Sequence, residues 1–546
     1  MRGRNALDLI AMTHMRRPGT VAALVLLGVA VRVVVAAQGW FYWDDLILLV
    51  QARETPLGEL LLRSHDGHLM PGSWLLIWLF ATLVDGLNWP AALTALAAGQ
   101  LTAAGAVAYA AWRICPRQAW WVTGLYVLAP VTLPVTTWLA AAVNSLPLHA
   151  ACAVWLAHGW LYLRRGRPAD AVIAAVAVLA AGFFSERVIF LAPFTVLLLL
   201  AWGPATRWLR LTAALVVPAA GWAIAYLATV GDPRVSEGGG ELFVQGYLRA
   251  FLPTLVGGPW DWERWHPGPP FATPPGAAIV LGVLAAVALL GWSIWRRHAA
   301  PLLVLAYPLL PFLALAVARS GPDTAAEITQ TLRHFAEVAV LMALTAGVLA
   351  AQNPRPPRWT PVLGVVLAAS SLFSTVTYAQ AWAEQPAREY FAALRASFDG
   401  REEPILDQAV PLEVLLPVAH PYNRLSALLG PPQISDSTSA PALVDGSGGL
   451  VDAELYPMRA TGAECGPGTF ALDGPLMERD WVLRLNYFAE DDGEIAVALD
   501  GEAVTVPVEA GLHQVHVALT GGGQELRVEG EVCLGRSEVG VLAPAR

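Results

Sequence analysis

Long apolar runs, separated by short polar segments, fill the first 380 positions of the chain. Several of these runs reach the roughly 20 residues that an α-helix needs to cross a bilayer. Twelve such windows are present, at 19–37, 72–86, 91–112, 118–136, 139–162, 169–184, 186–202, 209–230, 276–293, 300–318, 333–351 and 359–380. The pattern predicts a polytopic α-helical membrane domain over residues 1–380.

The pattern changes after residue 380. A helical stretch at 388–398 and an apolar run at 410–418 favour a small α/β connector over residues 381–440. Apolar and polar residues then alternate in short runs at 481–486, 495–499, 504–508 and 515–519. We read Asp500-Gly501 and Gly521-Gly522-Gly523 as turns between these runs. The alternation predicts a jelly-roll-like β-sandwich over residues 441–546.

Composition and charge support this division. Hydrophobic residues make up 56% of the 546 positions, above the roughly 45–50% of soluble proteins. After residue 380 lie 26 of the 43 acidic but only 10 of the 34 basic residues, so the tail carries about −16 and the rest about +7. No basic patch indicates nucleic acid. The chain has no Lys, which excludes a Walker A loop and a pyridoxal Schiff base.

Arginines between the apolar windows set the topology. The positive-inside rule places the clusters in the cytoplasm, and they lie at 2–17, 113–117, 164–167, 207–210, 296–297 and 355–358. This requires a single crossing between residue 38 and Arg113. Window 72–86 is short and ends at Asp85-Gly86, so we expect it to lie at the outer interface. Eleven passes follow, with an uncleaved N-terminal anchor, a cytoplasmic N-terminus and an extracytoplasmic tail at the plasma (inner) membrane.

The four cysteines form no CxxC pair, which argues against a zinc ribbon or a redox motif. Cys115 and Cys152 fall in the membrane part. Cys465 and Cys533 fall in the tail, where they are either bridged in an oxidising compartment or two unpaired core thiols.

The predicted outer face collects the unusual polar residues. In Trp43-Asp44-Asp45, two adjacent carboxylates repel each other, which raises the pKa of one toward the range of a general base. The alternative is an interfacial helix cap behind an aromatic belt at 40–43. In Ser64-His65-Asp66-Gly67-His68, two imidazoles flank a carboxylate, a group able to bind substrate or a divalent metal, the one candidate cofactor. An ordinary polar turn is the competing interpretation.

One acidic–basic pair and one pair of basic residues complete the candidate site. Glu186 and Arg187 lie in a turn between apolar runs, where Arg187 offers donors to a phosphate and Glu186 accepts from a sugar hydroxyl. Arg333 and His334 lie at the start of an apolar helix. They are a second candidate pair for binding a phosphate. The simpler explanations are that Glu186 and Arg187 neutralise each other, and that Arg333 and His334 extend to the lipid headgroups. Tryptophans in the loop 231–275 offer faces for sugar stacking or interfacial anchoring.

The layout resembles the GT-C glycosyltransferases, a superfamily that includes actinobacterial mannosyl- and arabinosyltransferases. The resemblance rests on Trp43-Asp44-Asp45 soon after the first span, on the His-Asp-Gly-His-Leu-Met-Pro segment at 65–71, and on about eleven passes with an outside tail. It implies transfer of a hexosyl or pentosyl group from a polyprenyl-phosphate donor to a cell-envelope glycan, lipid or protein, with inversion. Asp44 or Asp45 would then be the base, with Arg187, Arg333 and His334 neutralising the leaving phosphate. A jelly-roll-like sandwich outside such a membrane domain also resembles a carbohydrate-binding module, and a lid that merely stabilises the fold is the alternative.

Two other functions fit parts of the pattern. A non-enzymatic transporter or glycan-assembly factor with a carbohydrate-binding tail is the main alternative, although we find no internal repeat of the transporter kind. A membrane acyltransferase would need a buried catalytic histidine, for which His149 and His158 are available.

Overall fold

The computed structural model describes residues 18–203, 206–230, 239–318, 325–353, 358–430 and 433–545. The predicted cytoplasmic arginines Arg2, Arg4, Arg16, Arg17 and Arg355 lie outside these ranges. The chain divides into two compact units, residues 1–384 and 385–546. The expected further boundary at residue 440 stays a prediction.

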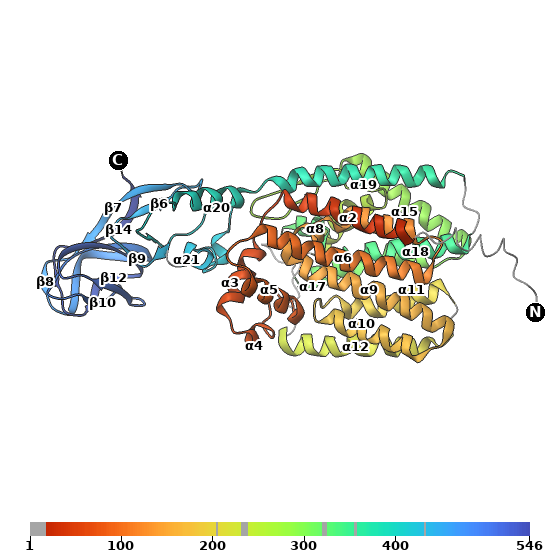
Figure 1. Ribbon diagram of the computed structural model, residues 1–546, viewed down its shortest axis with the longest axis horizontal. Coiled ribbons are helices and arrows are strands. Elements are labelled where there is room, and N and C mark those ends of the chain that lie inside the picture. Colours follow the sequence, from red (N-terminus) through yellow and green to blue (C-terminus); the bar gives the residue numbers. More distant parts are fainter. Residues whose placement is uncertain are drawn as a thin grey trace, which may run out of the picture. The chain divides into compact units, whose positions relative to one another are not determined.

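The first unit is a bundle of helices that run side by side (Figure 1). Among the described residues, seven helical segments are long and apolar enough to span a bilayer, and the bent pair 119–137 makes up to eight. The seven are α2 (Pro18–Ala37), α6 (Trp89–Ile114), α9 (Leu139–Arg165), α12 (Trp208–Val230), α15 (Gly276–Arg296), Ala300–Val317 and Thr360–Ser397, which includes α19 (Thr360–Ala383). The bent pair contains α7 (Ala119–Leu128) and α8 (Leu133–Thr137). The chain is therefore a multi-pass membrane protein.

Three shorter apolar helices match the remaining windows of the eleven-pass prediction. They are α10 (Pro168–Gly182), α11 (Val188–Trp202) and α18 (Val338–Gln352). All three pack among the long helices, α10 against α9 and α12, α11 against α12, and α18 against α6 and α7. In contrast, α5 (Pro71–Leu83), which covers the window set aside as interfacial, packs mainly on α3 (Asp44–Glu54). Membrane crossing by the three short helices stays a prediction.

Single residues in the sequence explain where some of these helices begin, end and pack against each other. Asn88 precedes α6, and its side chain accepts a hydrogen bond from the Ala91 amide at 3.1 Å, as an N-cap residue should. Gly166 ends α9 in the left-handed conformation at φ 69°, which glycine adopts without strain. Where α2 meets α7, a Cβ at Gly28 would lie 2.5 Å from Val127, so the small residue allows the close approach.

The predicted first outer loop is more deeply packed than an interfacial cap would be. Trp40, Phe41 and Tyr42 are at most 6% exposed, so they form core and not a surface belt. In α3, every residue from Asp45 to Ala52 is buried. The loop continues through α4 (Leu57–Leu60) into α5. Because α3 is buried on all sides, its first residues are held rigidly.

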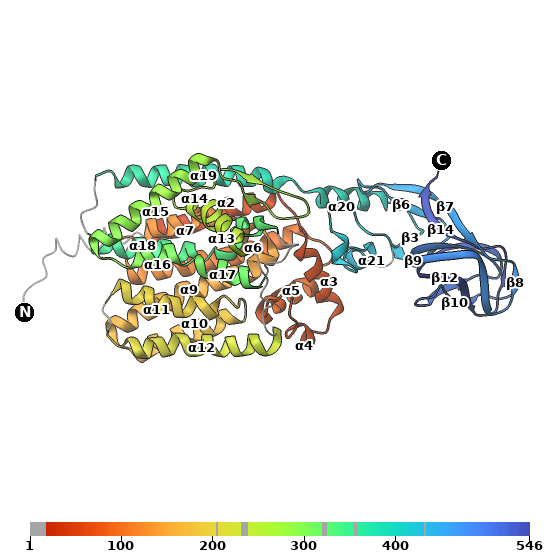
Figure 2. The ribbon, with the colours of Figure 1, turned by 180° about the vertical axis from the view of Figure 1, so that it is seen from behind.

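The second unit begins with α20 (Pro386–Ser397), followed by a parallel pair of short strands, β3 (Ile405–Leu406) and β4 (Ile434–Ser435), and by α21 (Leu425–Leu428). A ten-stranded sheet follows, with its main order β11-β10-β12-β9-β14-β7-β6. Figure 2 shows these strands from the other side. Their bounds are β6 (Ala442–Val444), β7 (Leu450–Ala460), β9 (Gly468–Ala489), β10 (Gly493–Ala498), β11 (Val504–Val508), β12 (Gly511–Glu529) and β14 (Glu538–Pro544), with β5 (Ser437–Thr438), β8 (Glu464–Cys465) and β13 (Cys533–Leu534) off this path.

The alternation read from the sequence forms the core of this sheet. Leu483, Leu485, Val497, Val506 and Val517 are at most 2% exposed and belong to one hydrophobic cluster. The tail is therefore a sheet-rich domain, as predicted, while its description as a jelly-roll sandwich stays a prediction.

The expected turn at Gly521–Gly523 is wrong. These glycines lie inside β12, where the pairing with β9 shifts register between Gly521 and Gly523. Gly521 and Gly523 have φ of 144° and 92°, so they permit an irregularity in a continuous strand rather than a chain reversal.

The tail cysteines are bridged. Cys465 in β8 and Cys533 in β13 are paired neighbours joined by a disulfide across 68 residues of sequence. Cys115 and Cys152 are free and buried. The structure thus confirms the bridged alternative for the tail.

Candidate functional site

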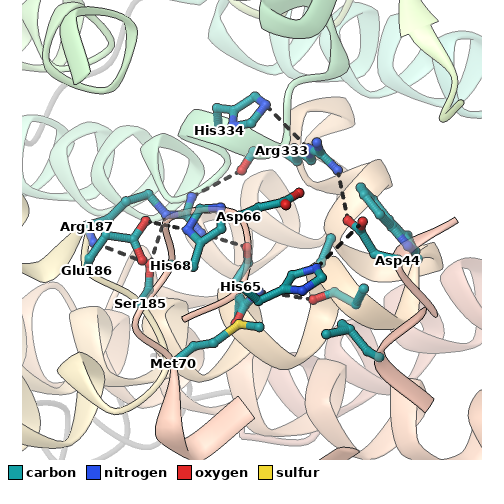
Figure 3. A pocket seen from close by; sticks show the side chains of 16 residues that line it. Asp44, His65, Asp66, His68, Met70, Ser185, Glu186, Arg187, Arg333 and His334 are labelled. Carbon is teal, nitrogen blue, oxygen red and sulfur yellow. Dashed lines mark hydrogen bonds and ion pairs between the residues drawn. The ribbon is translucent and has the colours of Figure 1, made fainter. Parts of the chain in front are cut away.

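A polar cavity of about 100 Å³ in the helical unit brings together nearly all the candidate residues (Figure 3). Its lining includes Asp44, His65, Asp66, His68, Glu186, Arg187, Arg333 and His334. They come from four separate parts of the sequence: the start of α3, the loop before α5, the turn before α11 and the segment before α18. Asp45 is the predicted residue that does not line this cavity.

Asp45 instead fastens the first outer loop. Its side chain is buried, with one carboxylate oxygen accepting from the Ala140 amide at 2.7 Å and the other from the Tyr42 amide at 3.3 Å. Burial raises the pKa of Asp45 well above its ordinary value, although the two backbone hydrogen bonds oppose the rise. This carboxyl links the loop to the start of α9 and does not line the polar cavity.

Asp44 is the member of the pair that faces the cavity. Its Oδ1 lies 3.9 Å from His65 Nε2, and its Oδ2 lies 4.0 Å from Arg333 Nη1. Both distances allow electrostatic attraction but exceed hydrogen-bond length. Trp43, just before it, has φ 41°, an uncommon conformation for a bulky residue that is typical of functional sites.

Arg333 is held against an aromatic face. Its guanidinium carbon lies 4.3 Å from the centre of the Trp138 ring, and its Nε donates to His334 Nε2 at 3.3 Å. Trp138 in turn packs on Tyr42, with ring centres 4.8 Å apart. The stack fixes the arginine plane, so that one nitrogen points toward Asp44.

His68 and Glu186 form a hydrogen-bonded pair in the cavity. His68 Nδ1 lies 3.0 Å from Glu186 Oε1. Burial alone would raise the pKa of Glu186, but His68 and the neighbouring Arg187 outweigh it and lower the pKa to about 2. Glu186 is therefore an anion at neutral pH.

Arg187 is engaged by the protein itself. Its Nη1 donates to Glu337 Oε2 at 2.6 Å and to the Arg333 carbonyl at 3.1 Å. Its Nη2 donates to Ser145 at 2.8 Å and its Nε to Ser185 at 3.1 Å. With these donors occupied, Arg187 joins the elements around the cavity, and a role in phosphate binding stays a prediction.

Glu337 is the site residue that the sequence reading missed. It is fully buried, and besides Arg187 it accepts a hydrogen bond from the Tyr307 hydroxyl at 2.5 Å. The signal was present, because an acidic residue among the apolar residues that begin a membrane helix requires a partner. What the sequence lacked was any indication that the partner lies 150 residues earlier.

Three of the cavity side chains are placed to share a metal ion. The ligand atoms of Asp44, His65 and Asp66 all lie within 4.8 Å of one another. Two carboxylates and an imidazole suit divalent ions of the zinc or manganese type, with water completing the coordination. A divalent metal therefore remains a candidate cofactor at this corner of the cavity.

Part of the tryptophan-rich loop packs into the helical unit, while Trp265 is 53% exposed, so sugar stacking stays a prediction. Trp262 is 7% exposed and donates to the Ser374 carbonyl at 3.0 Å. Arg264 donates to the Glu384 carbonyl at 2.6 Å and stacks over Tyr42 at 5.1 Å. These contacts fasten the loop to the end of α19 and to the first outer loop.

The histidines considered for acyl transfer are packed residues. His149 Nδ1 lies 3.0 Å from the Tyr126 hydroxyl. His158 contacts Asp170 through one ring nitrogen and Tyr109 through the other, at 2.8 and 2.9 Å. Neither lines the polar cavity.

No protein-family model matches this chain, and no curated protein matches it. Among solved structures it is similar to the arabinofuranosyltransferase AftD from Mycobacteria, with 12% sequence identity and a TM-score of 0.37. The match covers 95% of this chain and 58% of AftD. At this similarity the match assigns neither fold nor activity to this chain.

Proposed function

We propose that this protein is a GT-C membrane glycosyltransferase that moves a hexosyl or pentosyl group from a polyprenyl-phosphate donor to an acceptor hydroxyl outside the cytoplasmic membrane. One observation carries the proposal. A carboxylate, Asp44, faces a stacked arginine, Arg333, across a small polar cavity in a bundle of apolar helices. A base and a cation at this separation suit an acceptor hydroxyl on one side and a phosphate on the other.

In the proposed reaction, Asp44 removes the proton of the acceptor hydroxyl as its oxygen attacks the anomeric carbon. The bond from that carbon to the phosphate oxygen breaks on the opposite side, and polyprenyl phosphate leaves with the electron pair. A single in-line displacement inverts the anomeric centre. Arg333 is the cavity cation available to neutralise the leaving phosphate, and His68 and His334 are available as hydrogen-bond donors to it.

The ion pair between Arg333 and Asp44 suggests that the donor binds before Asp44 acts as a base. Arg333 attracts Asp44 at 4.0 Å, and a donor phosphate, with more negative charge and more acceptor oxygens, would compete for the same guanidinium. We expect donor binding to draw Arg333 away from Asp44. The carboxylate then regains its basicity when the donor is in place.

The cavity must also enlarge. A volume of about 100 Å³ holds only about three water molecules, which is less than a sugar and a phosphate require. His65 and Asp66 lie in a loop between α4 and α5, and we expect this loop to move when substrate enters.

The acceptor, the orientation and the tail belong to the same proposal. The arginine distribution puts the cavity and the tail on the extracytoplasmic side, where a cell-envelope glycan, a lipid or a protein supplies the hydroxyl. The sheet-rich tail would bind carbohydrate and present the acceptor. If a metal binds at Asp44, His65 and Asp66, it would supply further positive charge near the reacting oxygens.

The experiment that tests this function uses purified full-length protein in liposomes with a radiolabelled polyprenyl-phosphate sugar and an envelope-glycan acceptor. We expect labelled product with inverted anomeric configuration, and roughly tenfold to hundredfold less product when Arg333 is replaced by Ala at low donor concentration. If no polyprenyl-phosphate sugar binds or reacts, the transporter or assembly-factor alternative is the better one.

A further inference from the structure

Tyr42, in the predicted first outer loop, is the middle member of a series of contacts that ends in the polar cavity. Its ring centre lies 4.8 Å from the ring centre of Trp138, and the Arg264 guanidinium carbon lies 5.1 Å from the Tyr42 ring centre. Trp138 in turn carries the cavity arginine, Arg333, at 4.3 Å. Aromatic faces attract cations within about 6 Å. We refer to these four side chains, Arg333, Trp138, Tyr42 and Arg264, as the cation–aromatic series.

One end of this series is fixed to the backbone. Arg264 follows the short strand β1 (Trp262–Glu263) and is 8% exposed. Its Nη1 donates to the Glu384 carbonyl at 2.6 Å and to the Trp382 carbonyl at 3.3 Å, and its Nε donates to the Gly268 carbonyl at 2.9 Å. A planar guanidinium that donates to three backbone carbonyls has little freedom to turn. The series is therefore anchored at this arginine and reaches the polar cavity at its other end.

The backbone of Tyr42 bears on the carboxylate of the cavity. Its amide donates to Asp45 Oδ2 at 3.3 Å, and its carbonyl accepts from the Asp45 amide at 3.0 Å. These bonds hold the first turn of α3 and with it the direction in which Asp44 enters the cavity. Tyr42 thus supports both halves of the candidate site. Its ring supports Arg333 through Trp138, and its backbone supports the carboxylate through the neighbouring aspartate.

The ring of Tyr42, and not its hydroxyl, makes the contacts in the series. Tyr42 is 2% exposed, and its hydroxyl oxygen is buried with no hydrogen-bond partner among the residues that the structure describes. A hydroxyl that is buried without a partner costs free energy. Phenylalanine would keep the ring and remove this cost, so a Phe variant separates the two parts of the side chain.

We propose that Tyr42 is a positioning residue for sugar transfer, which holds Arg333 and Asp44 at the separation that the reaction requires. The inference deepens the proposed function and rests on it for the reaction itself. Asp44 Oδ2 and Arg333 Nη1 are 4.0 Å apart. A displacement of about 1 Å between groups that act together can cost on the order of 100-fold in rate. A buried residue that touches the supports of both groups controls this separation.

Replacing the Tyr42 ring tests the arm that leads to Arg333. Tyr42→Leu removes the ring but keeps the backbone amide, so we expect KM for the lipid-linked donor to rise about threefold to tenfold, with kcat per folded protein within about threefold. Tyr42→Phe should restore KM to within about twofold of the native value. A rise in KM for Tyr42→Phe as large as that for Tyr42→Leu would overturn the proposal, because the hydroxyl would then be the acting group.

Trp160 provides a matched control at a distance from the cavity. It is 6% exposed, and the Arg164 guanidinium carbon lies 4.7 Å from its ring centre. It does not line the polar cavity. Trp160→Leu therefore removes a buried ring from a similar cation–aromatic contact. We expect its melting temperature to fall while KM stays at the native value, and a rise in KM equal to that of Tyr42→Leu would contradict a specific role for Tyr42.

A double-mutant cycle shows whether Tyr42 acts through Arg333. In the Arg333→Ala background the ring has no arginine left to position, so adding Tyr42→Leu should change KM by no more than about twofold. A residue that only stabilises the fold would not show this dependence. If the two changes in KM multiply in full, the two residues act independently and the proposal is wrong.

A cryo-EM structure of the full-length Tyr42→Leu protein separates this inference from the proposed function. If the native protein neither binds nor transfers a polyprenyl-phosphate sugar, the proposed function fails, and the positions of Asp44 and Arg333 still test the positioning. We expect the Arg333 guanidinium to shift by about 1 Å or more relative to Asp44 in Tyr42→Leu and to keep its native place in Tyr42→Phe. An unchanged separation in Tyr42→Leu would overturn the inference.

Discussion

Two histidine–carboxylate clusters lie at opposite ends of α9, and only one of them forms a candidate site. At the C-terminal end, which is the predicted inner end, His158 and Asp170 are 2.8 Å apart and both are less than 10% exposed. At the N-terminal end, which is the predicted outer end, His68 and Glu186 are 3.0 Å apart. The positions that mark these ends, Ala140 and His158, are separated by about 27 Å along the helix.

The difference lies in what surrounds each pair. Both ring nitrogens of His158 are occupied, one by Asp170 and the other by Tyr109, so the inner cluster joins α9, α10 and α6. The outer pair shares a cavity with Asp44 and Arg333, which stand about 4 Å apart. A histidine–carboxylate pair is therefore not a sign of function in itself. A better indication of a candidate site is a carboxylate and a cation that face each other across a cavity.

Removing a buried charge should have the largest effect on stability and should distinguish the two ends. Glu337→Gln leaves the Arg187 guanidinium without its buried partner, and we expect the free energy of unfolding to fall by about 3–5 kcal/mol. Asp170→Asn at the inner end keeps an amide oxygen that can still accept from His158, and it should cost at most about 1–2 kcal/mol. Thermal melting in detergent measures both, and equal losses would contradict the ranking.

Arg333→Ala should weaken donor capture by about 1.5–3 kcal/mol, roughly a tenfold to hundredfold rise in KM, because a charge-assisted bond to phosphate is lost. Arg113→Ala is the control, since Arg113 lies over the Tyr109 ring in the inner cluster. Its KM should match that of the native protein. A similar rise in KM for both variants would mean that Arg333 acts only through folding.

The pair of Glu186 and His68 predicts that the protein loses stability in acid. Because the pKa of Glu186 is lowered in the folded state, from 4.5 to about 2, its contribution is present above the unfolded pKa and disappears as the pH falls between these values. We expect a loss of about 1–3 kcal/mol across this range. Glu186→Gln should flatten the dependence of melting temperature on pH, whereas Glu59→Gln, at an exposed position, should leave it unchanged.

The sequence predicted the outer site because charged residues at the edge of an apolar helix are costly and hence conspicuous. Asp44, His68, Glu186 and Arg333 were all found in this way, from segments that are distant in the chain. The separate roles of Asp44 and Asp45 could not be predicted from the sequence. Which of two adjacent carboxylates enters the cavity depends on the direction in which α3 begins, and this direction is fixed by the Asp45 bonds to Ala140 and Tyr42.

The missed features share a physical cause. Glu337 and Arg187 are joined across 150 residues, and the tryptophan loop packs on α19 through contacts such as Trp262 to Ser374, 112 residues apart. Periodicity predicts each helix by itself but carries no information on such pairings. The same limit applies to Gly521–Gly523, because a glycine cluster is compatible with a turn or with an irregularity inside a long strand.

The central claim is that Asp44 removes a proton while Asp45 holds the loop, and one paired measurement tests it most directly. Asp44→Asn and Asp45→Asn are compared by sugar transfer in reconstituted liposomes and by melting temperature. We predict that Asp44→Asn lowers transfer by roughly 10²–10⁴-fold with little change in melting temperature, and that Asp45→Asn lowers the melting temperature while folded protein keeps transfer within about tenfold. Full transfer by well-folded Asp44→Asn would contradict the account.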